Sequence, residues 1–448
     1  MLACLLVISL SLVVRFIIWI YPGYGWGNLT IYDVHLYTSY GRKFVNALLK
    51  GDFLGVASIR FGGPPLGILL TGLCSYVFEP FIDEYKAGLL APIISSSFTI
   101  SLIYLILRNS FKLPVKYAAI GSLIASFDPY LVQFSAAYLD SIGAFFLFVA
   151  IYTYLRFQDL TAKRYILIGL LISLAGITKF SFLIFALFFA LLLGLIEKDY
   201  KSGLSVFLAS LSLIPLIPWI WFGKTLSKAV ARNLAFNSLL PPIIFGPITI
   251  GIPEAYPWYI LTYFGMGQIH WNVLPSLSHF LLFCGIFYRL LNRNLRMTRR
   301  LVILLLAAIL MVAFIPRNYW TTSWGGGAIM GKGILLKQFY PYYFYFTNLV
   351  AGLVACSILF LKSSRNDVRN PLAIFLIMLY CLTAPFVTMM NAFYPYWDFI
   401  FTLIFNFSAG HPVIGKYGLQ ALLITIILCI AFFILITIMM LKRLSKKE

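Results

Sequence analysis

The sequence predicts an all-α, polytopic membrane protein. Apolar residues make up 61% of its 448 residues and charged residues only 11%, and the mean hydropathy is +0.93. In a soluble domain roughly a quarter of the residues are charged. Several apolar runs approach the ~20 residues that a helix needs to cross a bilayer. The chain therefore keeps most of its length in lipid.

Basic residues predict which way the chain is oriented. More than half of the 34 Lys and Arg residues gather in short segments that hold only three acidic residues; these segments are 108–116, 156–164, 289–300, 362–369 and 442–448. Such loops are typical of the cytoplasmic side. The net charge of +20 then reflects topology, and no nucleic-acid partner is expected.

With these segments inside, about twelve spans follow and both termini are cytoplasmic. The spans are predicted at 2–20, 87–107, 117–138, 141–156, 165–178, 181–196, 204–222, 271–290, 301–316, 342–361, 371–390 and 419–441. The first run is expected to be a retained span, because it lacks a basic n-region and Arg15 interrupts it. The six cysteines lie in apolar segments without metal-like spacing, so neither a disulfide framework nor a metal site is expected.

Four long loops are predicted on the outer side, rich in Tyr, Trp, Pro and Gly: 21–86, 223–270, 317–341 and 391–418. Within the first, residues 64–78 are apolar but lie between prolines and are short for a span. They predict a juxtamembrane or re-entrant helix. Functional residues are expected on this outer side.

The stretch IYDVHLYTSYGRKF, residues 31–44, follows the first span. Asp33 begins an amphipathic segment, so it either caps a helix or serves as a catalytic carboxylate. His35 either orients Asp33, binds substrate or has only a surface role.

Two further residues are unusual for a chain this apolar. Asp140 falls at the outer turn between two spans, where it either caps the next helix or joins a site. Segment 165–196 must cross twice, so Lys179 at its tip cannot project far into water. A cation at that depth is costly unless an anion pairs with it. Lys179 therefore either snorkels to the headgroups or binds the phosphate of a lipid.

Other outer residues are open to two interpretations. Three outer cations are concerned: Arg60, Arg317 and Lys337. Each alone is typical of an interfacial anchor, whereas the three together are compatible with an anion-binding site. Asp128, before Pro129, is expected to cap a broken span.

Several motifs follow one another along residues 1–200: Asp33 with Tyr37 and a helix over 34–50, Gly51-Asp52, the Pro-containing 60–66, Leu139-Asp140 and Gly176-Ile177-Thr178-Lys179. Together they resemble the GT-C-type glycosyltransferases, in the branch of dolichyl-phosphate-mannose protein mannosyltransferases and lipid A aminoarabinose transferase. The stretch 337–341 also matches that branch. The chain departs from it at Gly62 and Gly63, where some relatives have an acid and a lysine, and at Val34, where a second acid is frequent.

The resemblance implies a catalytic membrane module over 1–200 with the loop 21–86, and a variable module over 201–448. It implies transfer of a hexose or pentose from a polyprenyl (dolichyl) phosphate to an acceptor hydroxyl, with inversion, on the outer face of a multi-pass protein of the plasma membrane. The acceptor is a lipid, glycan or protein, and no nucleotide or metal cofactor is needed.

The resemblance also implies the role of each candidate residue. Asp33 is the general base, and Asp140 binds hydroxyls or holds a cation. The lipid phosphate is bound by Arg60, Lys179 and Lys337, with Arg317 as a weaker fourth. Tyr37 is a candidate for binding substrate, and so is His35, for which this is one of the alternatives given above. A lipid-linked glycan flippase or other transporter is the alternative, and an oligosaccharyltransferase is a second one.

Overall fold

The computed structural model describes nine stretches of the chain and four single positions: 2–20, 27–59, 65–135, 139–157, 160–216, 298–314, 319–320, 336–337 and 345–360, with 278, 281, 282 and 285. These residues are almost entirely helical. The exception is a ladder of two residues a side, in which β1 (Tyr319–Trp320) pairs antiparallel with β2 (Leu336–Lys337). The all-α prediction is confirmed.

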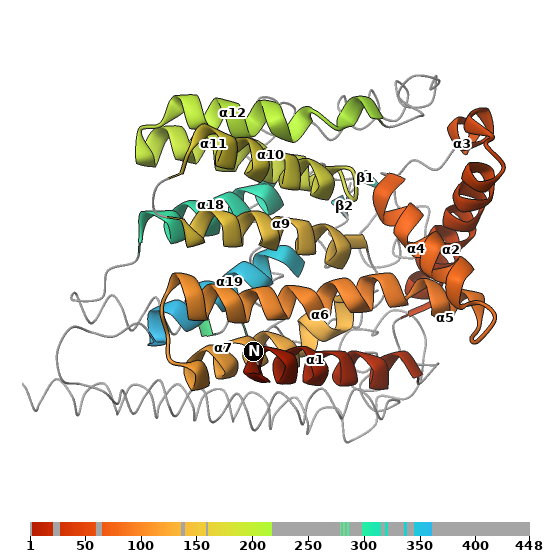
Figure 1. Ribbon diagram of the computed structural model, residues 1–448, viewed down its shortest axis with the longest axis horizontal. Helices are drawn as coiled ribbons and strands as arrows, with labels where there is room; N and C mark the ends of the chain where they lie inside the picture. Colours follow the sequence, from red (N-terminus) through yellow and green to blue (C-terminus); the bar gives the residue numbers. More distant parts are fainter. Residues whose placement is uncertain are drawn as a thin grey trace, which may run out of the picture.

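Most helices lie side by side in one bundle (Figure 1). They are α1 Leu2–Ile20, α6 Leu90–Leu105, α7 Val115–Phe127, α8 Pro129–Ser135, α9 Leu139–Arg156, α10 Ala162–Gly176, α11 Ser181–Leu192, α12 Tyr200–Leu211, α18 Arg299–Phe314 and α19 Tyr345–Phe360. Short turns follow some of them: the π-helical η1 Ile106–Ser110 and η2 Leu193–Glu197, and the 3-10 turn η3 Ile214–Leu216.

Two described helical segments are long and apolar enough to cross a bilayer, Glu84–Ser110 and Leu139–Arg156. They coincide with the predicted spans 87–107 and 141–156. Other bundle helices are shorter but apolar, among them Val115–Phe127 and Tyr345–Ile358. Together with the mean hydropathy of +0.93 over the whole chain, these helices support a polytopic membrane protein. The count of twelve spans stays a prediction, because 371–390 and 419–441 lie outside the described residues.

Aromatic rings fill the middle of the bundle. The ring of Phe346 on α19 meets the rings of Phe148, Phe182 and Phe185 edge-on, at centroid distances of 5.9, 5.9 and 5.1 Å. All four side chains are almost completely buried. Edge-to-face packing suits the ring quadrupoles, so α9, α11 and α19 meet here with defined geometry.

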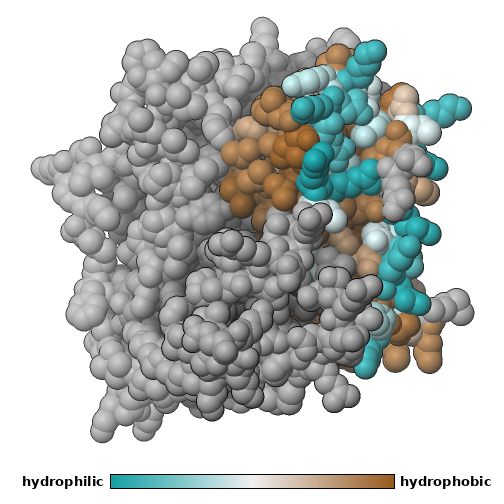
Figure 2. All heavy atoms as spheres, turned by 90° about the vertical axis from the view of Figure 1, so that its left-hand side faces the viewer, coloured by the Kyte–Doolittle hydropathy of each residue, from teal (hydrophilic) through white to brown (hydrophobic). Residues whose placement is uncertain are grey.

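One end of the bundle, the basic end, carries exposed Lys and Arg residues: Arg108, Lys112, Lys116, Arg156, Lys163, Lys198, Lys201 and Arg299. Figure 2 looks onto this end and shows hydrophilic side chains beside apolar ones. Three residues connect the helices there. The Tyr154 hydroxyl donates to Glu197 Oε1 at 2.7 Å, and Arg300 Nη1 donates to the Tyr154 carbonyl at 2.8 Å. The positions agree with the predicted cytoplasmic loops.

The helices of the first loop gather at the opposite end (Figure 1). We call them the cap: α2 Gly27–Leu49, α3 Phe53–Ser58, α4 Pro65–Phe78 and α5 Glu84–Gly88. Helix α4 runs across the ends of the bundle helices (Figure 1), and it confirms that a short helix forms within residues 64–78. Helix α2 begins at Gly27, so Asp33 lies inside it. The interpretation of Asp33 as a helix cap is therefore wrong.

Glycines let α2 and α4 touch backbone to backbone. A Cβ built on Gly72 would lie 2.1 Å from the carbonyl carbon of Gly41, and one on Gly41 would lie 2.3 Å from the Ile68 oxygen. Small residues allow this approach where helices cross in membranes. The crossing fixes α2 on α4.

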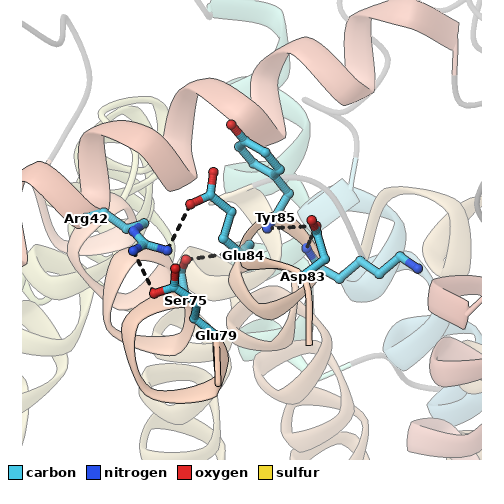
Figure 3. A network of polar contacts seen from close by, with 7 residues as sticks. Arg42, Ser75, Glu79, Asp83, Glu84 and Tyr85 are labelled. Carbon is cyan, nitrogen blue, oxygen red and sulfur yellow. Dashed lines mark hydrogen bonds and ion pairs between the residues drawn. The ribbon is translucent and has the colours of Figure 1, made fainter. Parts of the chain in front are cut away.

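Arg42 on α2 adds ion pairs to the packing of the cap (Figure 3). Its Nη2 lies 2.6 Å from Glu79 Oε2 and its Nη1 lies 2.9 Å from Glu84 Oε2. The hydrogen bond with Glu79 raises the pKa of Arg42 above its usual value. The Ser75 hydroxyl donates to the Glu84 carbonyl at 2.9 Å, so α4 and α5 are joined as well.

We expect Gly72→Ala to destabilise the cap, because the new methyl group meets backbone that cannot move aside. Overpacking of this kind costs about 1–3 kcal/mol. Thermal unfolding in detergent measures the change. Gly285→Ala is the control, since a Cβ there meets nothing nearer than 3.7 Å. Equal melting temperatures for the two variants would contradict the close crossing.

Candidate active site

Asp140 and Lys179 form an ion pair at the cap end of the bundle. Asp140 Oδ2 accepts a hydrogen bond from Lys179 Nζ. The Asp140 side chain is 4% exposed and the Lys179 side chain 17%. Lys179 thus has the anion that its depth requires, and it does not reach outward as a snorkelling side chain would.

The turn that carries Lys179 is short. Helix α10 has 15 residues, so it is about 22 Å long and does not span the ~30 Å of hydrocarbon by itself. The amide of Lys179 still donates to the Ala175 carbonyl at 2.8 Å, and the Phe182 amide already donates to the Lys179 carbonyl at 3.1 Å. With no room for a loop, Lys179 remains at the edge of the apolar layer.

One glycine brings α9 against α11 beside this pair. A Cβ on Gly143 would lie 2.1 Å from Cε2 of Phe182, so only glycine leaves space for that ring. Asp140 precedes Gly143 by three residues, and residues three apart share a helix face. Lys179 precedes Phe182 by three residues. The Gly143–Phe182 contact therefore places the carboxylate opposite the ammonium group.

The start of α4 lies over the ion pair. The Leu66 amide donates to the Ile177 carbonyl at 2.9 Å, which joins α4 to the α10–α11 turn. A Cβ on Gly67 would lie 3.0 Å from both Leu139 Cδ2 and Thr178 Cγ2, the neighbours of the paired residues. The cap and the ion pair are thus parts of one packed unit.

Helix α2 reaches the same unit through its tyrosines. Tyr37 and Tyr40 pack against an apolar cluster that is formed by Ile68, Ala91, Leu139 and Ile142. Asp33 lies four residues, about one helical turn, before Tyr37 on α2. The side chains of Asp33 and His35 lie outside what the structure describes, so their roles remain predictions.

The remaining predicted cations are only partly placed. Arg60 and Arg317 lie outside the described residues. Lys337 belongs to β2, opposite Tyr319 of β1, and this ladder lies at the cap end (Figure 1). Its side chain is outside the described part, so the phosphate-binding set stays a prediction.

Sequence reasoning underestimated a second polar cluster inside the bundle. Asp128 separates α7 from α8; its Oδ1 accepts from the Leu131 amide at 3.2 Å and its Oδ2 from the Ser278 amide at 2.7 Å. The expected capping of a broken span is confirmed. Arg15 on α1 is completely buried near it. The sequence signal was Arg15, a single charge inside an apolar run. Such a charge is unfavourable in lipid, so its presence indicates that it has interaction partners.

Among the residues that the structure describes, no group of three or more His, Cys, Asp or Glu side chains is placed to hold a metal ion. The chemistry available at the cap end is that of a buried carboxylate paired with a partly buried ammonium group beneath α4. A second carboxylate, that of Asp33, belongs to α2, which crosses α4.

These features define the class: a multi-pass helical membrane protein with a helical cap and an ion pair beneath it. Residues 63–222 match the sequence model of the dolichyl-phosphate-mannose-protein mannosyltransferase family. The match includes α4, Asp140 and Lys179, and it confirms the resemblance to GT-C glycosyltransferases. No match was found among curated protein sequences.

Two solved structures are similar in outline. The oligosaccharyltransferase of Archaeoglobus fulgidus is 14% identical, with a TM-score of 0.47 over 94% of this chain. ArnT from Cupriavidus metallidurans, bound to undecaprenyl phosphate, is 15% identical, with a TM-score of 0.44 over 82% of this chain. The chain spans 59% of the length of the first and 74% of the second.

We expect Lys179→Met to destabilise the protein more than the double variant Asp140→Leu/Lys179→Met. The single change leaves a buried carboxylate without its partner, which costs about 3–5 kcal/mol, whereas the double change removes both charges. Thermal unfolding in detergent compares them. Glu79→Gln is the control. The Glu79 side chain is 45% exposed, so breaking its ion pair with Arg42 is expected to lower the free energy of unfolding by less than about 1 kcal/mol. Additive effects at Asp140 and Lys179 would show that the pair is not coupled.

Proposed function

We propose that the protein is a glycosyltransferase that moves a sugar from a polyprenyl phosphate to an acceptor hydroxyl, with inversion at the anomeric carbon. One observation carries the proposal. The Asp140–Lys179 pair is built from two motifs of the matched family and lies directly under α4, which holds the helix of Asp33.

Asp33 is the general base. A hydroxyl is a weak nucleophile, so a positioned carboxylate takes its proton as it attacks the anomeric carbon. Attack opposite the leaving phosphate inverts the anomeric centre. Asp33 lies on a helix rather than on a loop, and that helix is anchored by Tyr37 and by the glycine crossing. Such anchoring supports a fixed position for the base.

Lys179 stabilises the departing lipid phosphate. Negative charge grows on the phosphate as the bond to the sugar breaks, and a fixed cation lowers the energy of that state. Asp140 keeps the ammonium group in place at the edge of the apolar layer, where a phosphate on a lipid arrives. Arg60, Lys337 and Arg317 complete the cation set in this proposal.

The active face is the cap end. The exposed basic residues lie at the other end of the bundle, which is typical of the cytoplasmic side. In this proposal the cap then faces the extracytoplasmic side of the plasma membrane. The acceptor is a lipid, a glycan or a protein. A hexose or pentose fits the mechanism equally, since only the anomeric carbon takes part.

One observation favours the alternative of a lipid-linked glycan flippase. Arg15 and Asp128 are completely buried inside the bundle, at a broken span. Charged residues and discontinuous helices are frequent in transporters. Transfer activity in detergent separates the two functions, because a flippase needs two compartments and a transferase does not.

We expect Asp33→Asn to lower kcat for sugar transfer by about 10²–10⁴-fold, because the amide cannot accept the proton. The measurement is transfer of labelled sugar from a polyprenyl-phosphate donor in detergent. The matched control is Asp52→Asn, a cap carboxylate that bonds the Gly55 amide at 2.7 Å. Full activity of Asp33→Asn would remove Asp33 from the mechanism.

We expect Lys179→Gln to reduce transfer about 10²–10³-fold, in line with the loss of one preorganised group that stabilises the transition state. Lys50→Gln, an exposed lysine at the end of α2, is the control and keeps near-normal transfer. Because Lys179 also stabilises the fold, rates are compared only among samples with matching unfolding curves. An equal loss in both variants would point to general destabilisation instead.

A further inference from the structure

The basic end carries more positive charge than the packing of its helices uses. Its exposed Lys and Arg residues come from four separate parts of the chain: 108–116, 156–163, 198–201 and 299. Among the residues that the structure describes, none of these side chains lies within ion-pair distance of a carboxylate. Their charges are therefore not balanced within the described part of the protein.

The described carboxylates at this end are engaged within the fold. Glu197 Oε1 accepts a hydrogen bond from the Tyr154 hydroxyl at 2.7 Å and lies 3.7 Å from Nε of Arg300. Asp199 is the N-cap of α12, where its Oδ1 accepts from the Ser202 amide at 3.1 Å. The exposed cations are thus left to an anionic partner from outside the described fold.

Two of the lysines are held in a costly backbone conformation. Lys112 has a φ of 54° and Lys198 a φ of 59°, both in the left-handed region. A side chain there is crowded by the neighbouring carbonyl group, which is why glycine is favoured at such positions. Each lysine follows a π-helical turn, η1 in the first case and η2 in the second. Strain of this kind and π turns are both frequent at functional sites, so a task for these two side chains is indicated.

Apolar side chains are exposed beside the cations. Val115 precedes Lys116, Leu195 lies in η2, and Tyr200 precedes Lys201. Figure 2 shows hydrophilic and hydrophobic residues next to one another on this end. A soluble polyanion, such as a nucleic acid, would gain from the charges alone and leave the apolar groups in water. A layer of phospholipid offers both phosphate groups and hydrocarbon, so it matches the whole surface.

We propose that the basic end binds anionic phospholipids, with lipid phosphates at Lys112 and Lys198 and acyl chains against the exposed apolar residues beside them. The cations are spread over several turns, so the surface fits a layer of headgroups rather than one molecule in a pocket. Each Lys or Arg near an anionic leaflet strengthens the binding about fivefold. This surface lies at the opposite end of the bundle from the cap, where sugar transfer is proposed.

Native mass spectrometry of the whole protein in detergent tests the proposal, with phosphatidylglycerol and phosphatidylcholine as the added lipids. We expect the wild type to bind phosphatidylglycerol more tightly and the variant Lys112→Gly/Lys198→Gly to lose on the order of tenfold of that affinity. Glycine accepts left-handed backbone, so this variant is expected to unfold at the wild-type temperature or above it. A second variant, Lys116→Gln/Lys201→Gln, removes two neighbouring charges within helices and is expected to show the same loss. Equal affinity of the wild type for the two lipids overturns the proposal.

The matched control is Lys43→Gln/Lys50→Gln, which removes as many exposed charges from α2 in the cap and is expected to keep the phosphatidylglycerol affinity of the wild type. An equal loss in this variant overturns the proposal, because the lipid would then respond to net charge alone. Glycerophosphoglycerol, the same headgroup without acyl chains, is expected not to compete at equal concentration. Full competition by it also overturns the proposal, because it would identify a site for soluble anions.

Discussion

The pairing of Asp140 with Lys179 is the interaction on which the cap end depends. Neither charge is stable alone in a layer of low polarity, because each unpaired ion loses its hydration without a replacement. Asp140 lies at the start of α9 and Lys179 in the α10–α11 turn. The ion pair between them therefore fixes the position of the start of α9 relative to that turn. The contact of Phe182 with Gly143 brings α11 and α9 close enough for this pairing.

The cap depends on that arrangement step by step. Helix α4 rests on Leu139 and Thr178, the direct neighbours of the paired residues, and α2 crosses α4 where Gly41 meets Gly72. The first contact involves the residues next to the ion pair, and the second joins two backbones. Helix α2 is therefore held closely to the ion pair. A shift of the α10–α11 turn would therefore move α2 as well. Arg42 adds a charged link between α2 and the acidic residues Glu79 and Glu84.

Much of this was predictable from the sequence because lipid imposes strong rules. Hydropathy and basic loops gave the spans, and the shortness of segment 165–196 indicated that Lys179 needs an anion. The prediction that Asp140 binds hydroxyls or holds a cation includes the role that the structure shows, since Asp140 holds Lys179. The pairing of these two residues was not predictable, because they lie 39 residues apart and the Gly143–Phe182 contact helps to bring them together. The Arg15 cluster was underestimated for a similar reason. A lone charge in an apolar run shows that a partner exists, but Tyr345 and Asp128 come from distant segments.

The start of α2 shows how a local rule gives way to tertiary structure. Asp is a good helix cap, so the local signal favours a helix that begins at Asp33, yet the helix begins at Gly27. Packing of Tyr37 and Tyr40 against the apolar cluster of Ile68, Ala91, Leu139 and Ile142 stabilises the helix as a whole. The difference matters for catalysis. In the proposed mechanism the base is therefore carried by a helix that crosses α4, and not by a loop.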